Sequence, residues 1–226
     1  MLTSGTTLYR KAPPSRNNKI AIICGLDGSG KTTLRLSLEN HGYEVLYYKD
    51  LKGTIWGEGL NFVNPGTEVA NLDGAARATY LLRYLNAETA RIEARLQHVA
   101  SIVTDGYYLR FLIKERVFAK LHYRQFTAGA RIADARYCFI FLDLDPEACY
   151  ERKMAGNHRI TPYECTTPTK EGFLEFQTRQ RAYLMEYIAK QTDVIRIDAT
   201  ATPSQVCRQT LTFLTTHEIH RTTIDR

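Results

Sequence analysis

Short apolar runs rich in β-branched residues alternate along the chain with segments of helical periodicity. Residues 19–24 (KIAIIC) form the first run, and residues 100–104 (ASIVT) and 137–142 (YCFIFL) form two more. Short runs that are almost wholly apolar are typical of strands buried on both faces of a parallel sheet. Residues 43–48 (YEVLYY) and 193–197 (DVIRI) are predicted as two further strands.

Between these runs, apolar residues recur at helical spacing. Leu34 and Leu38 share one face of a predicted helix over residues 33–40. Residues 50–71 contain several glycines and a proline, so they are predicted to form an irregular connection. Further helices are predicted over residues 73–98, after Asp105 through Leu121, from Asp145 onward, over 170–190, and after a capping box at Thr202–Gln205.

This alternation of strands and helices predicts an α/β fold. The expected architecture is a three-layer sandwich, in which helices cover both faces of a parallel sheet and ligands bind at the carboxyl ends of the strands. A chain of 226 residues with 44% hydrophobic content suits a single core. We therefore expect one domain over residues 19–226, preceded by a tail over residues 1–18 that contains two adjacent prolines.

Between the first predicted strand and helix, residues 25–32 (GLDGSGKT) match the phosphate-binding pattern G-x-x-x-x-G-K-[ST]. Glycines let the backbone N–H groups turn toward a phosphate chain, and the helix N-terminus adds about half a positive charge. Lys31 would reach the β- and γ-phosphates of ATP, and the Thr32 hydroxyl would bind Mg²⁺. A chance glycine-rich turn is the alternative, but the order of strand, loop and helix favours ATP binding. The expected ATP-binding residues are Gly25, Asp27, Gly28, Ser29, Gly30, Lys31, Thr32 and Thr33.

Composition narrows the function only in part. The formal net charge of +6 suits phosphorylated ligands, but the basic residues are dispersed, so nucleic acid is not the favoured partner. The five cysteines form no C-x-x-C pair, which indicates a reducing compartment rather than a disulfide framework or a zinc site. No apolar stretch is long enough to span a membrane and no signal-peptide pattern is present, so we expect a cytoplasmic protein without a membrane partner.

Other motifs distinguish among phosphate-loop proteins. The N-K-x-D guanine reader of small GTPases and the L-S-G-G-Q signature of transport ATPases are both absent. Residues 25–33 (GLDGSGKTT) instead resemble the G-x-D-G-x-G-K-T-T loop of the thymidylate kinase family. Residues 141–147 (FLDLDPE), followed by Arg152, resemble that family's L-D-x-x-P-E segment before a flexible lid. The family's aromatic and arginine-containing helix is resembled by Phe173, Phe176, Arg179, Arg181 and Tyr183.

The resemblance implies a P-loop kinase with a small lid over about residues 152–168, which uses ATP and Mg²⁺ to phosphorylate a nucleoside monophosphate. The best single expectation for the acceptor is dTMP, which would give dTDP. Members of the family whose phosphate loop lacks an arginine carry a catalytic arginine in the lid. Gly28 follows Asp27 here, so Arg152 and Arg159 are the expected lid arginines.

Asp105 ends the third predicted strand, where it could hold a Mg²⁺-bound water or, alternatively, cap the next helix. Lys31, Asp105, Arg152 and Arg159 are thus the candidate catalytic residues, and Thr32 and Asp105 the candidate metal ligands. The resemblance implies that Asp27 contacts a sugar hydroxyl of the acceptor. The candidate acceptor-binding residues are Asp27, Lys49, Tyr80, Arg83 and Arg110.

The chain departs from the family where the acceptor base is read. The family's D-R-[YH] is replaced by a segment beginning Asp105-Gly106-Tyr107, which looks closer to the D-G-F-P-R of adenylate kinases. The family's A-Y-Q segment, which cradles thymine, falls near Ile113-Lys114-Glu115, so base discrimination is expected to be loose. Two alternatives therefore stay open: a kinase for a deoxynucleoside or a modified base in nucleic acid, and a regulatory protein that binds ATP without transferring phosphate. A homodimer also stays open.

Overall fold

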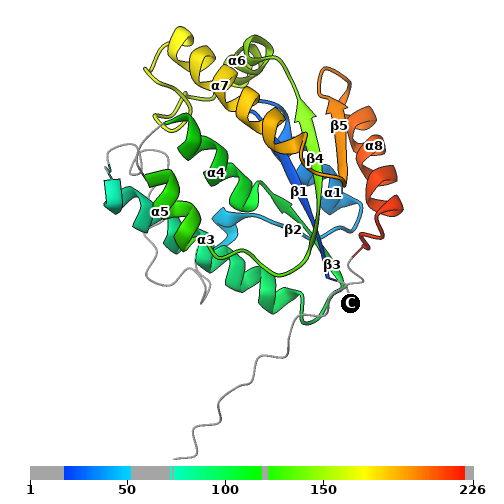
Figure 1. Ribbon diagram of the computed structural model, residues 1–226. Coiled ribbons are helices and arrows are strands. Elements are labelled where there is room, and N and C mark those ends of the chain that lie inside the picture. The colour runs from blue at the N-terminus through cyan, green and yellow to red at the C-terminus, as the bar shows by residue number, and fades with distance from the viewer. Residues whose placement is uncertain (1–17, 52–71, 73, 119–121, 222–226) are drawn as a thin grey trace, which may run out of the picture.

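The computed structural model describes residues 18–51, 72, 74–118 and 122–221. Within this part of the chain, all neighbouring strands of one sheet pair in parallel, in the order β2-β3-β1-β4-β5 (Figure 1). The strands are β1 (Lys19–Gly25), β2 (Val45–Leu46), β3 (Ser101–Asp105), β4 (Arg136–Asp143) and β5 (Val194–Asp198). The five predicted strands and their parallel arrangement are confirmed.

Helices connect the strands and cover both faces of the sheet (Figure 1). The α-helices are α1 (Lys31–Asn40), α3 (Gly74–Arg95), α4 (Tyr107–Val117), α5 (His122–Gly129), α6 (Pro146–Ala155), α7 (Lys170–Ile188) and α8 (Pro203–Thr216), and a short 3-10 helix, η1, spans Tyr48–Leu51. The predicted caps are present, since the Asp145 carboxylate accepts from the backbone N–H of Glu147 and Thr202 forms a capping box with Gln205.

The central strand β1 shows why the fold has three layers. Ile20 and Ile22 face a core shared with α3, α4, α5 and α7. Ala21 and Ile23 face the opposite side and pack against residues of α1 and α8. Because successive side chains of a strand point to opposite faces, an apolar run with no polar residue requires helices on both sides. The predicted three-layer sandwich is confirmed.

Two predicted boundaries are wrong. The strand predicted over residues 43–48 is reduced to Val45–Leu46, because the chain turns into η1, where the N–H of Asp50 bonds the carbonyl of Tyr47. The helix predicted through Leu121 ends at Val117, where the next residue, Phe118, directs its ring to Tyr163 and Phe176. The predicted tail, apart from Asn18, and most of the predicted irregular connection lie outside the described residues.

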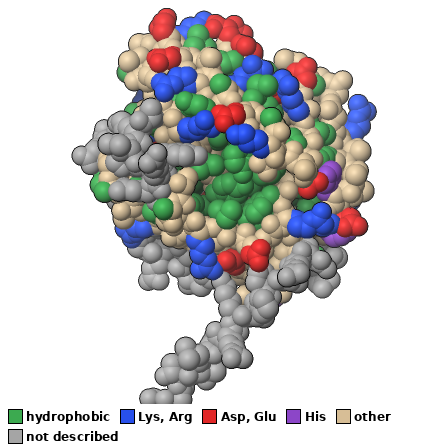
Figure 2. All heavy atoms as spheres, viewed as in Figure 1, with side chains coloured by type: hydrophobic (Ala, Val, Ile, Leu, Met, Phe, Trp, Pro, Cys, Tyr) green, Lys and Arg blue, Asp and Glu red, His purple; other side chains and the backbone are tan. Residues whose placement is uncertain are grey.

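The face shown in Figure 2 has an apolar hollow at its centre, bordered by basic and acidic side chains. Among the helices that the structure describes, none has the length and apolar character needed to cross a membrane.

Candidate active site

The loop between β1 and α1 is shaped by glycines that no other residue could replace. Gly25 and Gly28 have φ angles of 152° and 94°. A Cβ atom on Gly25 would lie 2.6 Å from the Ser29 hydroxyl, and one on Gly28 would lie 2.5 Å from the carbonyl oxygen of Cys149. Both distances are too short for a real contact, so the glycines set how closely this loop approaches β4 and α6.

The N-terminus of α1 is open to an anion. Its capping position, Gly30, supplies no side-chain cap, and the first turn contains no acidic residue. The first N–H groups of the helix therefore lack the partners that a side chain would supply, and the helix dipole favours a negative group there. The nearby hydroxyl of Ser29 is buried and makes no hydrogen bond. The ammonium of Lys31 lies over the same loop and donates to the carbonyls of Gly25 (3.1 Å) and Leu26 (2.6 Å).

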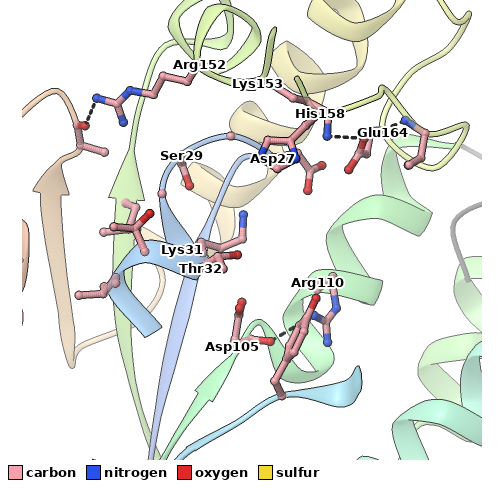
Figure 3. A pocket seen from close by; sticks show the side chains of 18 of the residues that line it. Asp27, Ser29, Lys31, Thr32, Asp105, Arg110, Arg152, Lys153, His158 and Glu164 are labelled. Carbon is pink, nitrogen blue, oxygen red and sulfur yellow. Dashed lines mark hydrogen bonds and ion pairs between the residues drawn. The ribbon is translucent and has the colours of Figure 1, made fainter. Parts of the chain in front are cut away.

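This loop opens into a cavity of about 650 Å³, a size ordinary for small-molecule sites (Figure 3). Most of the predicted site residues line it: Asp27, Gly28, Ser29, Gly30, Lys31, Thr32, Thr33, Lys49, Asp105, Arg110 and Arg152. Among the described residues, Gly25, Tyr80, Arg83 and Arg159 do not line the cavity, and α3 instead contributes Leu81. The arrangement therefore groups the predicted phosphate site with only part of the predicted acceptor site.

Asp105 lies beside the phosphate loop because β3 and β1 are adjacent parallel strands. Ile23 pairs with Asp105 in register, and the backbone N–H of Gly106 donates to the carbonyl of Ile23 at 2.9 Å. The two strands thus end together, which brings Asp105 and Thr32 to one cavity (Figure 3). A carboxylate and a hydroxyl are the oxygen ligands that Mg²⁺ takes in nucleotide sites, so this donor set fits that ion. No cluster of three or more His, Cys, Asp or Glu side chains suited to a metal occurs in the described residues.

The turn after Asp105 is held in an unusual conformation. Tyr107 has a φ angle of 36°, which is uncommon for a residue with a side chain. Its buried hydroxyl contacts the Thr89 hydroxyl at 2.7 Å and accepts a hydrogen bond from the N–H of Ala133 at 3.0 Å. Backbone strain of this kind persists only where surrounding contacts enforce it, and it concentrates at functional sites. Here it fixes where α4 begins, and therefore how α4 directs Arg110 into the cavity.

Asp27 is an ion-pair partner as well as a loop residue. Its Oδ2 atom lies 2.8 Å from Nζ of Lys114 and accepts a hydrogen bond from Gln177 Nε2 at 3.1 Å. Burial raises the pKa of the Asp27 carboxyl, but the charges of Lys114 and Lys31 and the hydrogen bonds outweigh burial and hold that pKa well below its usual range. Asp27 is therefore ionised at neutral pH and joins the phosphate loop to α4 and α7.

Four basic side chains from four elements surround Tyr47, which follows β2. Three of them lie over its ring: the guanidinium of Arg35 at 5.1 Å, that of Arg110 at 5.7 Å, and the ammonium of Lys49 at 5.8 Å from the ring centre. Arg91 donates to the Tyr47 carbonyl at 3.4 Å. We call these five residues the Tyr47 cluster. Tyr47 was not predicted as a site residue. The available signal was that Tyr47 lies near the end of a predicted strand, two residues before Lys49.

The predicted lid residues differ in where they lie. Nη2 of Arg152 donates to the carbonyl of Ala199 at 2.7 Å, and Lys153 forms an ion pair of 2.9 Å with Glu164 (Figure 3). Lys153 and Glu164 both line the cavity, as does His158. Arg159 is exposed. Of the two predicted lid arginines, Arg152 is thus the one at the cavity wall.

No protein-family model matches the chain, and no curated protein matches it in sequence. Among solved structures, deoxyadenosine kinase from M. mycoides, with dCMP and a flexible dCDP bound, aligns with a TM-score of 0.60 at 15% identity over 88% of this chain and 99% of that one. The same enzyme with dATP bound gives 0.54 at 16% identity, over 87% and 99%. Thymidylate kinase from Candida albicans gives 0.63 at 18% identity, over 90% and 94%.

The chain shares the fold of these kinases. The α/β P-loop architecture predicted from the sequence is confirmed. At these identities the likeness extends to the fold alone, so the chemistry has to be argued from the residues of this chain.

Several residues that carried the family resemblance serve to hold elements together. Asp143, at the end of β4, accepts from Arg181 of α7 at 2.9 Å and from Arg196 of β5. Burial raises the pKa of Asp143, but the hydrogen bonds from both arginines outweigh burial and lower it. Arg179 donates to the carbonyl of Val117 at 2.8 Å, which ties α7 to α4. These contacts position the helices around the cavity.

Part of the cavity wall is apolar, and this part was not predicted from the sequence. Ala199, Ala201, Pro203 and Val206 line it where β5 leads into α8. Small apolar side chains leave room for a flat ring and offer it no competing polar partner. The only sequence signal was the capping box at Thr202, which fixes the start of α8.

Lys114 is a second residue that the sequence analysis did not assign to the site. It follows Arg110 by four positions on α4, so both side chains lie on one helical face and both line the cavity. Besides its ion pair with Asp27, its ammonium donates to the carbonyl of Tyr163 at 3.3 Å. This segment, predicted to replace the thymine cradle, therefore connects the phosphate loop to the segment before α7.

Behind Lys114 lies a fully buried ion pair. The Arg77 guanidinium donates two hydrogen bonds to the Glu115 carboxylate, at 2.8 and 2.9 Å. The Tyr163 hydroxyl donates to Oε1 of the same carboxylate at 3.0 Å, and the Arg77 guanidinium lies 4.2 Å from the centre of the Phe118 ring. Because charges this deep require complete pairing, the pair rigidly connects α3, α4 and the segment before α7.

Proposed function

We propose that the protein is a nucleotide kinase that transfers the γ-phosphate of ATP to a nucleoside monophosphate, with dTMP as the expected acceptor. The observation that carries this proposal is one cavity lined both by Lys31 and the uncapped start of α1 and by Tyr47, Lys49 and Arg110 of the Tyr47 cluster. Two phosphate-binding environments in one cavity suit a reaction between two phosphorylated molecules.

ATP would bind along the phosphate loop. The N–H groups at the start of α1 and the Lys31 ammonium would hold its phosphates, and the apolar wall near Ala199 and Pro203 would hold its base. Thr32 and Asp105 would hold Mg²⁺, which would neutralise part of the charge on the phosphates. Arg152 would release the Ala199 carbonyl and contact the transferred group, where positive charge stabilises the transition state most.

The acceptor site supports a monophosphate over a nucleoside. A phosphate is an anion that attacks without a general base, and it needs cations to hold it next to the anionic γ-phosphate. Lys49 and Arg110 line the cavity at the Tyr47 cluster and supply such cations. Both contacts of Asp27 involve Oδ2, which leaves Oδ1 for a hydroxyl of the acceptor sugar.

A second candidate is a deoxynucleoside kinase, and one specific observation favours it. Phosphorylation of a sugar hydroxyl needs a base to accept its proton, and the Asp105 carboxylate lines the cavity beside the phosphate loop. The deoxyadenosine kinase and thymidylate kinase structures are similar to this chain to nearly the same degree, with TM-scores of 0.60 and 0.63. The acceptor has to be decided by experiment.

The deciding experiment compares kcat/KM for dTMP, dUMP, dCMP, dAMP, thymidine and a DNA oligonucleotide, with ATP and Mg²⁺. We expect turnover of the monophosphates, with dTMP preferred by a smaller factor than in a kinase whose polar groups are dedicated to reading thymine. The reason is that Lys114 and Glu115 are engaged with Asp27 and Arg77, so neither is available to read a base. Turnover of thymidine alone would support the second candidate, and turnover only of an oligonucleotide would support a nucleic-acid acceptor.

Substitution of the lid arginines tests the proposed catalytic group. Arg152→Ala is expected to lower kcat by about a hundredfold or more with little change in the Kd of ATP, because a charge clamp acts mainly in the transition state. Arg159→Ala is expected to lower kcat only if the lid closes over the cavity, since Arg159, unlike Arg152, does not line the cavity here. Arg208→Ala, an exposed arginine of α8 outside the cavity lining, serves as the control. Wild-type turnover in both lid variants would place the catalytic group elsewhere.

A further inference from the structure

Glu88 is a buried carboxylate behind the acceptor side of the cavity that the proposed reaction does not use. It lies on α3, its side chain is only 2% exposed, and neither carboxylate oxygen has a hydrogen-bond partner among the described residues. Its nearest cation is Arg110, whose Nη2 atom lies 3.7 Å from Oε2. A buried carboxylate without hydrogen bonds is unfavourable for folding, so its presence calls for a functional reason.

The surroundings of Glu88 are mixed in charge. The pKa of Glu88 is raised to about 7. Burial is the largest cause and the charges of Asp105 and Asp50 add to it, whereas the charges of Arg110 and Arg91 lower this pKa. The contribution of Arg110 is therefore electrostatic attraction across 3.7 Å, without the hydrogen bonds of a close pair. By contrast, the Arg77–Glu115 pair on the same two helices closes at 2.8 Å with full hydrogen bonding.

Arg110 is held from two sides and extends into the cavity. Its Nη1 atom donates to the carbonyl of Asp105 at 3.2 Å (Figure 3), and its Nη2 atom lies 3.7 Å from Oε2 of Glu88. The guanidinium also lies near the rings of Tyr47 and Phe111, at 5.7 and 5.0 Å from their centres. A loose electrostatic partner can orient a cation without competing strongly for its hydrogen-bond donors. At 3.7 Å the Glu88 carboxylate accepts no hydrogen bond from Arg110, so it does not compete with a phosphate for the guanidinium N–H groups.

We propose that Glu88 is a positioning residue that orients Arg110 toward the phosphate of the acceptor, and that it thereby sets the affinity for the acceptor and not for ATP. This inference rests on the proposed function, because it assigns Arg110 to the acceptor phosphate. Glu88 itself is outside the cavity lining and touches no substrate. Its carboxylate is retained despite an unfavourable burial because the orientation of Arg110 depends on it.

Glu88→Gln tests the proposal, because it keeps the shape of the side chain and removes its charge. We expect KM for dTMP to rise about tenfold, kcat to change less, KM for ATP to stay within about twofold, and the melting temperature to stay equal or rise. Tenfold corresponds to about 1.4 kcal/mol of lost acceptor binding. Stability does not fall because the variant no longer buries a carboxylate that lacks hydrogen bonds. Glu93→Gln is the matched control, since Glu93 lies on the same helix and pairs with Arg131 away from the cavity.

A double-mutant cycle with Arg110→Lys separates positioning from other effects. If Glu88 acts through Arg110, Glu88→Gln causes no further rise in KM for dTMP in the Arg110→Lys background. An undiminished rise in that background would overturn the inference, as would an unchanged KM in a folded Glu88→Gln protein. A fall in melting temperature with equal losses for both substrates would show a structural role and would also overturn it. Wild-type protein that turned over no monophosphate would instead contradict the proposed function and, with it, the inference.

Discussion

Replacement of Lys31 by alanine is expected to abolish phosphoryl transfer while leaving the fold intact. The Lys31 ammonium contributes a positive charge beside the phosphate loop, and its hydrogen bonds go to the backbone carbonyls of Gly25 and Leu26, only six and five residues earlier in the chain, so they join no elements that are distant in sequence. Losing a cation that stabilises the transferring phosphoryl group costs kcat about a thousandfold, or about 4 kcal/mol in the barrier. Single-turnover assays with ATP and dTMP, combined with circular dichroism, measure both parts of the prediction.

Lys190→Ala is the control for this experiment, because Lys190 lies on the surface and pairs with Glu186 away from the cavity. It should turn over as the wild type does. A folded Lys31→Ala protein that retained more than about a tenth of the wild-type kcat would refute the role assigned to Lys31. Its activation free energy would then lie within about 1.4 kcal/mol of the wild-type value.

The largest effect on stability is expected from Glu115→Ala. This change leaves the Arg77 guanidinium fully buried without its bidentate partner and also removes the acceptor for the Tyr163 hydroxyl. Removal of one member of a buried pair costs about 3–5 kcal/mol, because an uncompensated charge remains in the core. Urea denaturation followed by circular dichroism should show a large fall in the midpoint, with a slope close to that of the wild type.

Glu186→Ala is the matched control, since it removes an exposed carboxylate that pairs with Arg116 and Lys190 at the surface. Its midpoint should be indistinguishable from that of the wild type. The double variant Arg77→Met with Glu115→Leu should recover much of the stability lost in Glu115→Ala, because neither charge is then left buried alone. A Glu115→Ala protein as stable as the wild type would contradict the structural role given to this pair.

The sequence predicted the sheet because its strands are buried on both faces and therefore read as unbroken apolar runs. Residues 19–24 and 137–142 are of this kind, and both became central strands. The edge strand β2 was overestimated, because Tyr47 has an aromatic side chain suited to a strand while its backbone turns toward η1. Where a strand ends depends on contacts with η1 and α3 that the local sequence does not contain.

The phosphate site was predictable because its residues are contiguous. One loop supplies the glycines, Lys31 and Thr32, and the local pattern determines their geometry. The proposed acceptor site is assembled from separate elements, so its residues carry no common motif. Lys49 and Arg110 were predicted as candidates from the sequence, whereas the roles proposed for Tyr47 and Glu88 depend on packing between β2, α3 and α4.

The motifs that resemble the family contain both residues that line the cavity and residues that hold elements together. Asp143 and Arg181 carried part of the family resemblance, and in the structure they form an ion pair that fixes α7 against the sheet. A motif records that residues recur together, and such recurrence arises from packing as readily as from chemistry. Only the position of each side chain relative to the cavity separates the two.

The most direct test of the proposed function is to identify the product of the reaction between ATP and dTMP. The protein is incubated with dTMP, Mg²⁺ and ATP labelled at the γ-phosphate, and the nucleotides are separated by ion-exchange chromatography. We predict that the label appears in dTDP, that its formation matches ADP release mole for mole, and that Lys31→Ala forms none. Label that appeared only in inorganic phosphate would contradict transfer to a nucleoside monophosphate. The same conclusion would follow if the protein formed no dTDP from dTMP but formed labelled dTMP when thymidine was the substrate.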